Sequence, residues 1–336
     1  MSPTKVLLIS DRRPGHTNLS EGIAAAFARR RSTEVNRIEV SRGGWPGPMA
    51  ALATRSPFTP ERILSIIYGL DEQDLPDADV IISAGAETLA ANVCSAKLKS
   101  AKNIFYGSLR QYRAADFALV MTSYKRSVTA PNMVQFLKPS ALDPDKLPDL
   151  SGGGPPRVLG LLLGGPTRNT RFSESEWKSL VDLVENSYRT NGIRWHVSDS
   201  RRTPHVASDM FRAKASDADG AIVQFISSGS PSSPPLSDLF AKVDGVVCTS
   251  DSSSMVSEAV WARRPLVAAE PLKFKISRNE QEYRRWLTQN RWCATAKISR
   301  LRPESLITAF ESVVPRKANA LEELADLLES RLHMST

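Results

Sequence analysis

A run of hydroxyl-bearing residues at 249–254 follows an apolar stretch at 245–248 and leads into a predicted helix. Where a strand ends in such a turn and a helix begins, backbone N–H groups without partners and side-chain donors gather at the helix N-terminus. This arrangement favours anions such as phosphate. Glu258 follows about one turn further in, where a carboxylate would accept the hydroxyls of a ribose. The candidate binding residues of this segment are Asp251, Ser252, Ser253, Ser254 and Glu258.

The same segment has a purely structural interpretation. Ser254 would then cap the helix, and Glu258 would be favoured near its start by the helix dipole alone. Three other turns carry similar donors, and together they favour the nucleotide-binding interpretation.

A glycine-bearing turn follows the apolar stretch at 157–163. Gly164 and Gly165 would expose backbone N–H groups, and Thr167 and Arg168 would add side-chain donors, a combination that suits a diphosphate. No Lys-Ser/Thr pair ends the turn, so it is not a Walker A loop. The alternative is a tight strand-to-helix turn without a ligand.

An arginine pair lies in the next such turn, after a predicted strand at 195–198. Arginine binds phosphate with a two-pronged fork, and neighbouring hydroxyls fix the orientation. The pair follows a strand and lies between two other candidate anion-binding turns, and this position supports a phosphate site. The candidate residues here are Ser200, Arg201, Arg202 and Thr203.

The turn after the first strand, 10–16, holds the candidate catalytic residues. His16 has the protonation range for acid–base work, and Asp11 is a candidate general base at the strand end. Gly15 predicts a tight turn that comes close to a ligand, and we include it among the binding residues. No Gly-x-Gly-x-x-Gly is present, so an ordinary NAD enzyme is not predicted.

Composition bounds the class of protein. The chain has 336 residues, 41% of them hydrophobic and 24% charged, which is typical of a soluble globular protein with two domains. No stretch approaches the ~20 apolar residues of a membrane span, and the N-terminus predicts a buried strand and not a signal peptide. The net charge of +8 indicates anionic partners. The scattered cysteines (Cys94, Cys248 and Cys293) fit a reducing cytoplasm.

Short apolar runs alternate with helical stretches, which predicts parallel sheets covered by helices. In the first half we expect a helix at 20–31 with a capping box of Asn18 and Glu21, and further helices from Thr59 and at 86–98. A break at 139–156, rich in proline and glycine, predicts the connection to the second half. The predicted strands of the first half are 5–10, 35–40, 80–84, 103–106, 117–121 and 134–136.

The second half restarts with a strand at 157–163 and a helix at 177–190, capped by the run at 173–176. A turn-rich loop is expected at 227–235. The remaining predicted strands are 195–198, 220–224, 245–249 and 266–269, and the remaining predicted helices are 206–213, 303–314 and 319–332. Ligands of such sheets bind beyond the carboxyl ends of the strands, where all four turns fall.

Four motifs occur in an order that resembles the mitochondrial-fission ELM-type family. They are the segments 11–18 (Asp-Arg-Arg-Pro-Gly-His-Thr-Asn), 164–166 (Gly-Gly-Pro), 200–204 (Ser-Arg-Arg-Thr-Pro) and 250–259. The resemblance implies the GT-B architecture, with two Rossmann-like doubly wound α/β domains facing a cleft. The second domain would bind a nucleotide sugar and the first would bind the acceptor. We expect the domains at 1–145 and 157–314, with a C-terminal helix, 315–336, packing back on the first.

Bacterial members of that family are described as lipopolysaccharide-core glycosyltransferases. The resemblance therefore implies a metal-independent glycosyltransferase without a cofactor, which transfers a sugar to a cell-envelope glycan or glycolipid. We expect it in the cytoplasm, with peripheral contact to the anionic inner membrane face, where the stretch at 45–58 would touch a lipid-linked acceptor.

Other functions remain open at this stage. A nucleotide-sugar epimerase would share the architecture, and the family's plant members suggest a non-catalytic interaction protein. Nucleic acid is not expected as a partner, because the basic residues are dispersed. The resemblance weakens between 43 and 145, where the expected arginine-bearing turn is absent at 84–88. The acceptor then differs, or the first domain has lost catalysis.

Overall fold

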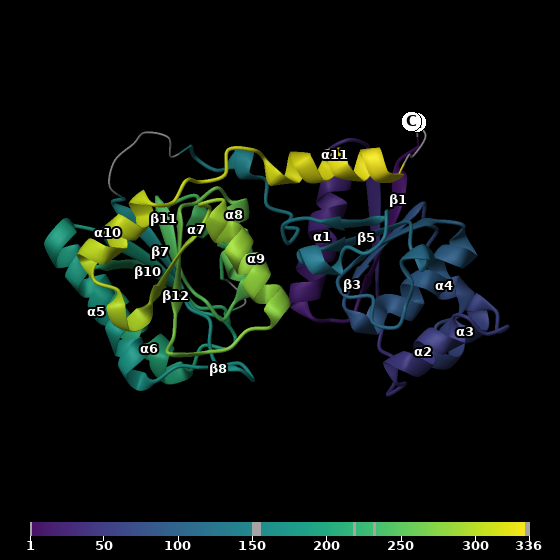
Figure 1. Ribbon diagram of the computed structural model, residues 1–336, viewed down its shortest axis with the longest axis horizontal. Helices are drawn as coiled ribbons and strands as arrows, with labels where there is room; N and C mark the ends of the chain where they lie inside the picture. The colour runs from purple at the N-terminus through teal and green to yellow at the C-terminus, as the bar shows by residue number, and fades with distance from the viewer. Residues whose placement is uncertain (1, 150–155, 218–219, 231–232, 333–336) are drawn as a thin grey trace. The chain divides into compact units, whose positions relative to one another are not determined.

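The computed structural model describes residues 2–149, 156–217, 220–230 and 233–332 (Figure 1). The contacts of the chain divide it into two units, Met1–Leu142 with Ala320–Thr336, and Asp143–Asn319. Residues 150–155 of the predicted connection, with its glycine triplet, lie outside the described residues, as do 231–232 of the predicted loop at 227–235.

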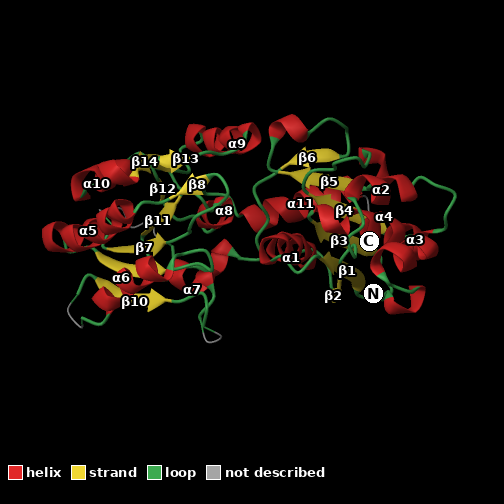
Figure 2. Ribbon diagram, turned by 90° about the horizontal axis from the view of Figure 1, so that it is seen from below, coloured by secondary structure: helices red, strands yellow, loops and turns green. Residues whose placement is uncertain are grey.

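The first unit is built on a six-stranded parallel sheet of order β2-β1-β3-β4-β5-β6 (Figure 2). The interior strand β1 carries four apolar residues in succession, Val6 to Ile9, and all are buried. A strand that is apolar on both faces must be covered on both faces. The strands are β1 (Thr4–Ser10), β2 (Thr33–Glu39), β3 (Val80–Ala84), β4 (Lys102–Tyr106), β5 (Leu119–Thr122) and β6 (Met133–Gln135).

Helices cover both faces of this sheet. Leu7 and Ile9 lie in one core cluster with Leu64 and Leu89, which come from helices on the same face. On the other side, α11 lies beside α1 (Figure 1). Arg30, two residues after the end of α1, forms an ion pair of 2.6 Å with Asp326 of α11. The helices are α1 (Pro14–Ala28), α2 (Gly47–Ala53), α3 (Pro60–Tyr68), α4 (Leu89–Lys99) and α11 (Ala320–Leu332).

The second unit holds another six-stranded parallel sheet, of order β10-β9-β7-β11-β12-β14. A short antiparallel pair, β8 (Thr170–Arg171) with β13 (Lys273–Phe274), stands beside it. The strands of the main sheet are β7 (Val158–Leu162), β9 (Arg194–Ser198), β10 (Ile222–Ile226), β11 (Gly245–Thr249), β12 (Leu266–Glu270) and β14 (Ala294–Lys297).

One core cluster of the second unit joins Leu161 and Val247 of the sheet to Trp177, Phe211 and Phe310 of three helices. These parallel sheets with helical covers confirm the predicted doubly wound α/β class. The helices are α5 (Glu174–Asn191), α6 (His205–Ala215), α7 (Leu236–Phe240), α8 (Ser253–Trp261), α9 (Arg278–Gln289) and α10 (Pro303–Glu311).

Local signals placed several elements correctly. The predicted strands at 80–84 and 245–249 agree with β3 and β11. Helix α5 begins after Ser173 in a capping box with Glu176, and α3 begins after Thr59 with Pro60 in its first position. In the described part of the chain, no helix combines the length and apolar character needed to cross a lipid bilayer.

The predicted start of the first helix is wrong. Helix α1 begins at Pro14, six residues before the predicted start, and the expected capping box of Asn18 and Glu21 does not form. Pro14 explains the early start, because proline suits the first helical position, where no N–H partner is needed. Gly15 is therefore helical and makes no tight turn; the left-handed residue of this connection is Arg12, with φ of 63°.

The stretch at 45–58, for which the sequence predicted no helix, contains α2. The sequence also gave no prediction of α7, α9, β14 and the pair β8 and β13.

Candidate functional site

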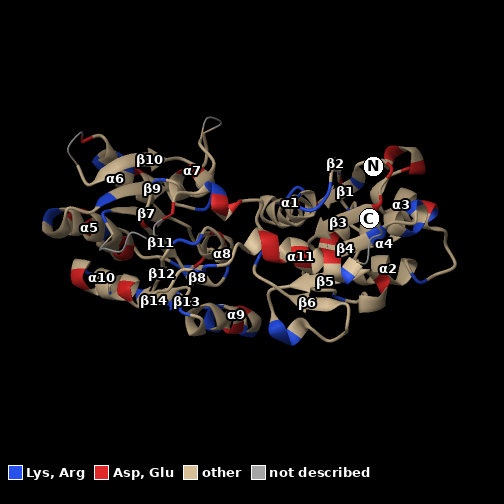
Figure 3. Cartoon of the chain, turned by 90° about the horizontal axis from the view of Figure 1, so that it is seen from above, with Lys and Arg blue, Asp and Glu red and all other residues tan. Residues whose placement is uncertain are grey.

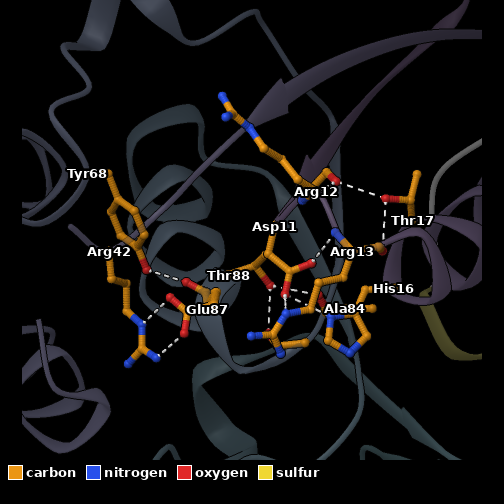
Figure 4. A network of polar contacts seen from close by, with 12 residues as sticks. Asp11, Arg12, Arg13, His16, Thr17, Arg42, Tyr68, Ala84, Glu87 and Thr88 are labelled. Carbon is orange, nitrogen blue, oxygen red and sulfur yellow. Dashed lines mark hydrogen bonds and ion pairs between the residues drawn. The ribbon is translucent and has the colours of Figure 1, made fainter. Parts of the chain in front are cut away.

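Asp11 and His16 form a hydrogen-bonded pair at the carboxyl end of β1 (Figure 4). Asp11 Oδ2 lies 2.8 Å from His16 Nδ1, and the Asp11 side chain is buried. Asp11 Oδ1 accepts a bond from the Arg13 backbone N–H at 3.2 Å, which fixes the carboxylate. A carboxylate on Nδ1 selects the tautomer whose Nε2 is free to accept a proton. Nε2 makes no hydrogen bond to the described residues, and the ring is partly exposed.

Gly85 supports this pair from the neighbouring strand. It follows β3 with φ of 92°, and a Cβ on it would stand 2.2 Å from His16 Nδ1 and 2.9 Å from Asp11 Oδ2. Any other residue would therefore displace the imidazole. A glycine is required here by both the backbone conformation and the close approach.

An ion pair continues the network away from Gly85. Arg42 donates from Nε to Glu87 Oε2 at 2.9 Å and from NH2 to Oε1 at 2.5 Å, a two-pronged pair (Figure 4). Tyr68 OH donates to the Glu87 carbonyl at 2.8 Å. The hydrogen bonds from Arg42 lower the pKa of the Glu87 carboxyl, against the opposing effect of burial. This network fixes the short 3-10 helix, Ala86–Thr88, that follows Gly85.

In the second unit, Asp251 joins the ends of three strands. Its Oδ2 accepts from Gly165 N at 3.0 Å and pairs with Arg202 NH2 at 2.8 Å. Its Oδ1 accepts from Thr249 Oγ1 at 2.8 Å, and Thr249 Oγ1 in turn accepts from Gly164 N at 2.7 Å. The carboxylate is buried, and burial raises its pKa, while the bonds from Gly165 and Thr249 oppose that rise. Asp251 thus organises the turns after β7, β9 and β11.

The two glycines of the turn after β7 allow these turns to touch. A Cβ on Gly164 would lie 2.2 Å from Asp251 Oδ1, and one on Gly165 would lie 1.8 Å from the Arg202 carbonyl oxygen. Their N–H groups already bind Thr249 and Asp251, so these amides are not available to a diphosphate. The role expected for them from the sequence, as phosphate donors, is replaced by a structural one.

Thr203 has a structural role as well. Its hydroxyl is buried and donates to the carbonyl oxygens of Leu163 and Gly164, at 2.9 and 2.7 Å. The Ser200 backbone N–H donates back to Thr203 Oγ1 at 2.8 Å. The turn after β9 is therefore fixed on the turn after β7.

The N-terminus of α8 begins at the same edge of the sheet. Ser252 is the N-cap, and its hydroxyl accepts from Met255 N, so the structural interpretation of Ser254 as the cap is wrong. Ser254 is exposed, and its amide and hydroxyl donate to no described residue. Ser250 Oγ is buried without a hydrogen-bond partner among the described residues. Donors without acceptors at a helix N-terminus form an anion site.

Glu258 lies on the same face of α8 as Ser254, because the two residues are four apart. Side chains on a helix tilt toward its N-terminus, so the Glu258 carboxylate extends toward Ser254. Glu258 is partly buried. The backbone positions of Ser254 and Glu258 are about 6 Å apart along the helix axis.

Sequence reasoning missed the support that α9 gives to α8. Ser253 Oγ donates to Glu280, and Glu280 Oε1 accepts from Arg284 Nε at 2.8 Å. Arg284 NH2 reaches the Ser250 carbonyl at 3.2 Å. This largely buried network holds the turn before α8, and a Glu and an Arg four residues apart were its only signal in the sequence.

Three predicted residues stand apart from these contacts. Thr167 is partly exposed, its amide donating to the Thr170 carbonyl at 3.0 Å, and Arg168 and Arg201 are exposed, with no hydrogen bond to the described residues. Thr167 and Arg168 lie in the turn after β7, where Thr167 Oγ1 accepts from Asn169 N at 3.3 Å, and Arg201 lies in the turn after β9.

The topology of each sheet explains why these turns gather. In chain order the strands of the second sheet run 3-2-1-4-5-6, and the order reverses between β7 and β11. The first sheet reverses between β1 and β3. Parallel α/β sheets bind ligands at such switch points. Asp11, His16 and Gly85 stand at the first, and Asp251 with the start of α8 stands at the second.

The cysteines offer no nucleophile. Cys94, Cys248 and Cys293 are buried and take part in no disulfide. Burial raises the pKa of Cys94 to about 12 and that of Cys293 to about 11. A thiolate is the reactive form of cysteine, so these residues are core residues.

Solved structures similar to this chain include MurG from Acinetobacter baumannii, with 12% identity, a TM-score of 0.53, and coverage of 98% of this chain and 100% of that one. The glycosyltransferase SnogD from Streptomyces nogalater shares 12% identity with a TM-score of 0.53, over 99% and 96% of the two chains. The UDP-GlcNAc 2-epimerase from Methanocaldococcus jannaschii shares 13% identity with a TM-score of 0.54, over 97% and 100%. These glycosyltransferases and epimerases have the GT-B fold, which this chain shares.

Among curated sequences, an uncharacterized protein of Rickettsia prowazekii (strain Madrid E) is 24% identical over 175 residues. The match covers 52% of this chain and 47% of that protein, so the chain spans about half the length of this relative. The profile of the family described as "Mitochondrial fission ELM1" matches residues 14–306, which is most of the chain. The chain therefore belongs to the mitochondrial fission ELM1 family.

Proposed function

We propose that this protein is a glycosyltransferase, which moves a sugar from a nucleotide-sugar donor to a hydroxyl of a cell-envelope glycolipid, such as a lipopolysaccharide precursor. The observation that carries the proposal is the pairing of two kinds of chemistry at the two switch points. An oriented histidine stands at the first, and Ser254 at the start of α8, with Glu258 about one turn along, stands at the second.

The second unit would hold the donor. The amide and hydroxyl of Ser254 and the hydroxyl of Ser250 would bind the diphosphate, and the exposed Arg201 would add charge. Glu258 would accept the ribose hydroxyls one turn along α8. Of the other predicted donors, Arg168 and Thr167 remain candidates for the diphosphate, and Gly164 and Gly165 do not, since their amides are bonded.

The first unit would supply the base. His16 Nε2 would take the proton of the acceptor hydroxyl, and Asp11 would hold the ring and stabilise the imidazolium that forms. The acceptor oxygen would attack the anomeric carbon. The bond from that carbon to the diphosphate oxygen would break, and the nucleoside diphosphate would leave with the electron pair. Helix N–H groups and arginine would offset its charge without a bound metal.

A nucleotide-sugar epimerase is the second candidate, because a UDP-GlcNAc 2-epimerase is among the similar structures. The product separates the two. An epimerase converts the nucleotide sugar with no acceptor present, and a transferase releases nucleoside diphosphate when an acceptor is added. A peripheral position at the inner membrane face belongs to the transferase proposal, since its acceptor would be lipid-anchored.

Ligand-induced stabilisation tests the donor site. Unfolding temperatures are measured with a panel of nucleotides and nucleotide sugars, for the native protein, for Glu258→Ala, and for Glu311→Ala as an exposed helical control. A ligand at about a hundred times its Kd adds about 2.7 kcal/mol, which is several degrees. We expect a nucleotide sugar to stabilise the native protein and the control alike, and Glu258→Ala much less. Equal stabilisation of all three proteins, or none by any nucleotide sugar, would refute the donor site.

A further inference from the structure

Large apolar side chains are exposed along and beside α2. The exposed fractions are 36% for Trp45, 52% for Met49, 69% for Leu52 and 48% for Phe58. We call these four residues the α2 patch. Leu52 and Met49 are among the most exposed large apolar residues of the described chain. Neighbouring exposed residues of this kind mark a binding surface for an apolar partner.

The patch follows from the amphipathic pattern of α2. Met49 and Leu52 are three residues apart and share one face of the helix. Ala50 and Ala51 are buried and lie in the core cluster that includes α4. The small alanines let α2 pack closely, and the larger apolar residues point outward, which is the reverse of the usual amphipathic arrangement.

Cations border the α2 patch. Arg62 stands over the Phe58 ring, 5.0 Å from its centre, and Arg55 and Arg110 are exposed. From residue 42 to residue 68 the chain has three arginines and a single acidic residue, Glu61. Figure 3 shows the lysines and arginines of this unit in blue. An apolar surface bordered by positive charge complements an anionic lipid surface.

The residues that flank α2 make contacts at the edge of the first sheet where the candidate base stands. Arg42 comes shortly before α2 and pairs with Glu87, which lies two residues beyond Gly85. After α2, Arg55 donates to the Gln111 carbonyl in the turn that follows β4. Helix α2 therefore lies along the carboxyl edge of the first sheet, the edge at which Asp11 and His16 stand.

We propose that the α2 patch docks on an anionic phospholipid bilayer. Met49 and Leu52 enter the interfacial region, Trp45 and Phe58 lie at headgroup level, and Arg55, Arg62 and Arg110 face the lipid phosphates. The inference extends the proposed function. It rests on that function only for the statement that a lipid-anchored acceptor would reach His16 from this surface. Lipid binding needs no sugar transfer, so either proposal can fail without the other.

Vesicle co-sedimentation tests the docking. The full chain is mixed with vesicles of phosphatidylcholine alone, or with about 30% phosphatidylglycerol, a content that gives an anionic surface. The native protein should bind the anionic vesicles. Met49→Glu with Leu52→Glu should lower the partition coefficient by about ten-fold or more, because two charges replace the inserted side chains. The matched control is Val206→Glu with Leu272→Glu, at residues that are 67% and 78% exposed in the second unit, and it should bind as the native protein does.

A second variant makes the test independent of the fold of α2. Arg110→Glu lies outside the helix and should weaken binding to anionic vesicles only. Absence of native binding to anionic vesicles would overturn the proposal, as would equal loss in the α2 variant and the control. Sedimentation velocity gives a further contrary outcome: a native dimer that Met49→Glu with Leu52→Glu converts to a monomer, without vesicle binding, would make this face a subunit interface.

Discussion

Asp11 Oδ2 lies 2.8 Å from His16 Nδ1, because a short turn at residues 11–13 leads directly into the first turn of α1. The turn around Arg12 carries the chain from β1 into α1, and His16 then lies in the first helical turn, above the carboxylate. The pair is thus set by rigid elements, as an acid–base group requires.

The pair predicts a specific catalytic defect. Asp11→Asn removes the carboxylate that orients the ring, and His16→Ala removes the base, so each should lower kcat of sugar transfer by about 10²–10⁴-fold. The KM for the donor should change little, because the proposed donor residues lie in the second unit. Steady-state kinetics measures both constants. His205→Ala, an exposed histidine of α6, is the control and should keep native activity.

Replacing Gly85 should produce a steric clash with His16. In Gly85→Ala the new methyl meets the His16 ring, and the backbone at φ of 92° and ψ of 150° is one that only glycine adopts readily. We expect a loss of about 3 kcal/mol in the free energy of unfolding, measured in urea, together with loss of transfer.

Gly69→Ala is the matched control for Gly85. Gly69 also has positive φ, at 65°, but a Cβ on it meets no atom within 4 Å. It should cost about 1 kcal/mol and leave transfer intact. If the two variants lost equal stability and Gly85→Ala kept its transfer activity, the close contact between Gly85 and His16 would not be needed for activity.

Replacing Asp251 should destabilise the protein more than replacing an exposed aspartate. Asp251→Ala leaves the Gly165 N–H and the Arg202 guanidinium without their acceptor, at a cost of about 3 kcal/mol in the free energy of unfolding. Asp209→Ala, which breaks the exposed pair with Arg212, should change it by less than about 0.5 kcal/mol. Chemical denaturation compares the two; a similar small change in both would contradict the organising role of Asp251.

The contribution of the Glu87 carboxylate to the free energy of unfolding should depend on pH. The pKa of its carboxyl is below the ordinary value of 4.5, with Arg42 as the main cause, so folding favours the ionised form. The contribution is therefore complete above pH 4.5 and is lost as the pH falls through the lowered pKa.

Glu87→Gln should consequently destabilise the protein by about 1 kcal/mol at pH 7, and by less at pH 3, because protonation of the native carboxyl has begun below pH 4.5. Urea unfolding at both values measures this. A difference between the native protein and the variant that stays constant across this range would show that the pair does not respond to protonation as described.

Continuous apolar runs and capping residues made much of the fold predictable. Strands such as β3 and β11 are short, mostly apolar stretches that are buried along their whole length, as in a parallel sheet covered on both faces. Helix α9 gave no such signal, because it is mostly polar and buries few residues, among them Tyr283 and Leu287. Glu280 and Arg284 connect α9 to the start of α8 and to the turn before it, and such tertiary contacts leave no local signal in the sequence.

The candidate site was predictable in position but not in role. The turns after β1, β7, β9 and β11 were located because strand ends are visible in the sequence. The functions of the glycines were not, since they depend on which neighbour approaches. We expected Gly15 to form a turn, but it lies in helix α1. The segment around Gly85 was noted only because it lacks the arginine expected from the family, yet Gly85 packs against His16. Contacts between distant strand ends carry no local signal.

The most direct test of the account is acceptor-dependent release of nucleoside diphosphate. The nucleotide sugar that stabilises the protein is incubated with a lipid-anchored cell-envelope glycan, and both products are followed by mass spectrometry. The account predicts a glycan that gains one sugar residue and an equal amount of nucleoside diphosphate, both reduced at least about 100-fold in His16→Ala. Conversion of the nucleotide sugar to an epimer without acceptor, or full transfer by His16→Ala, would contradict it.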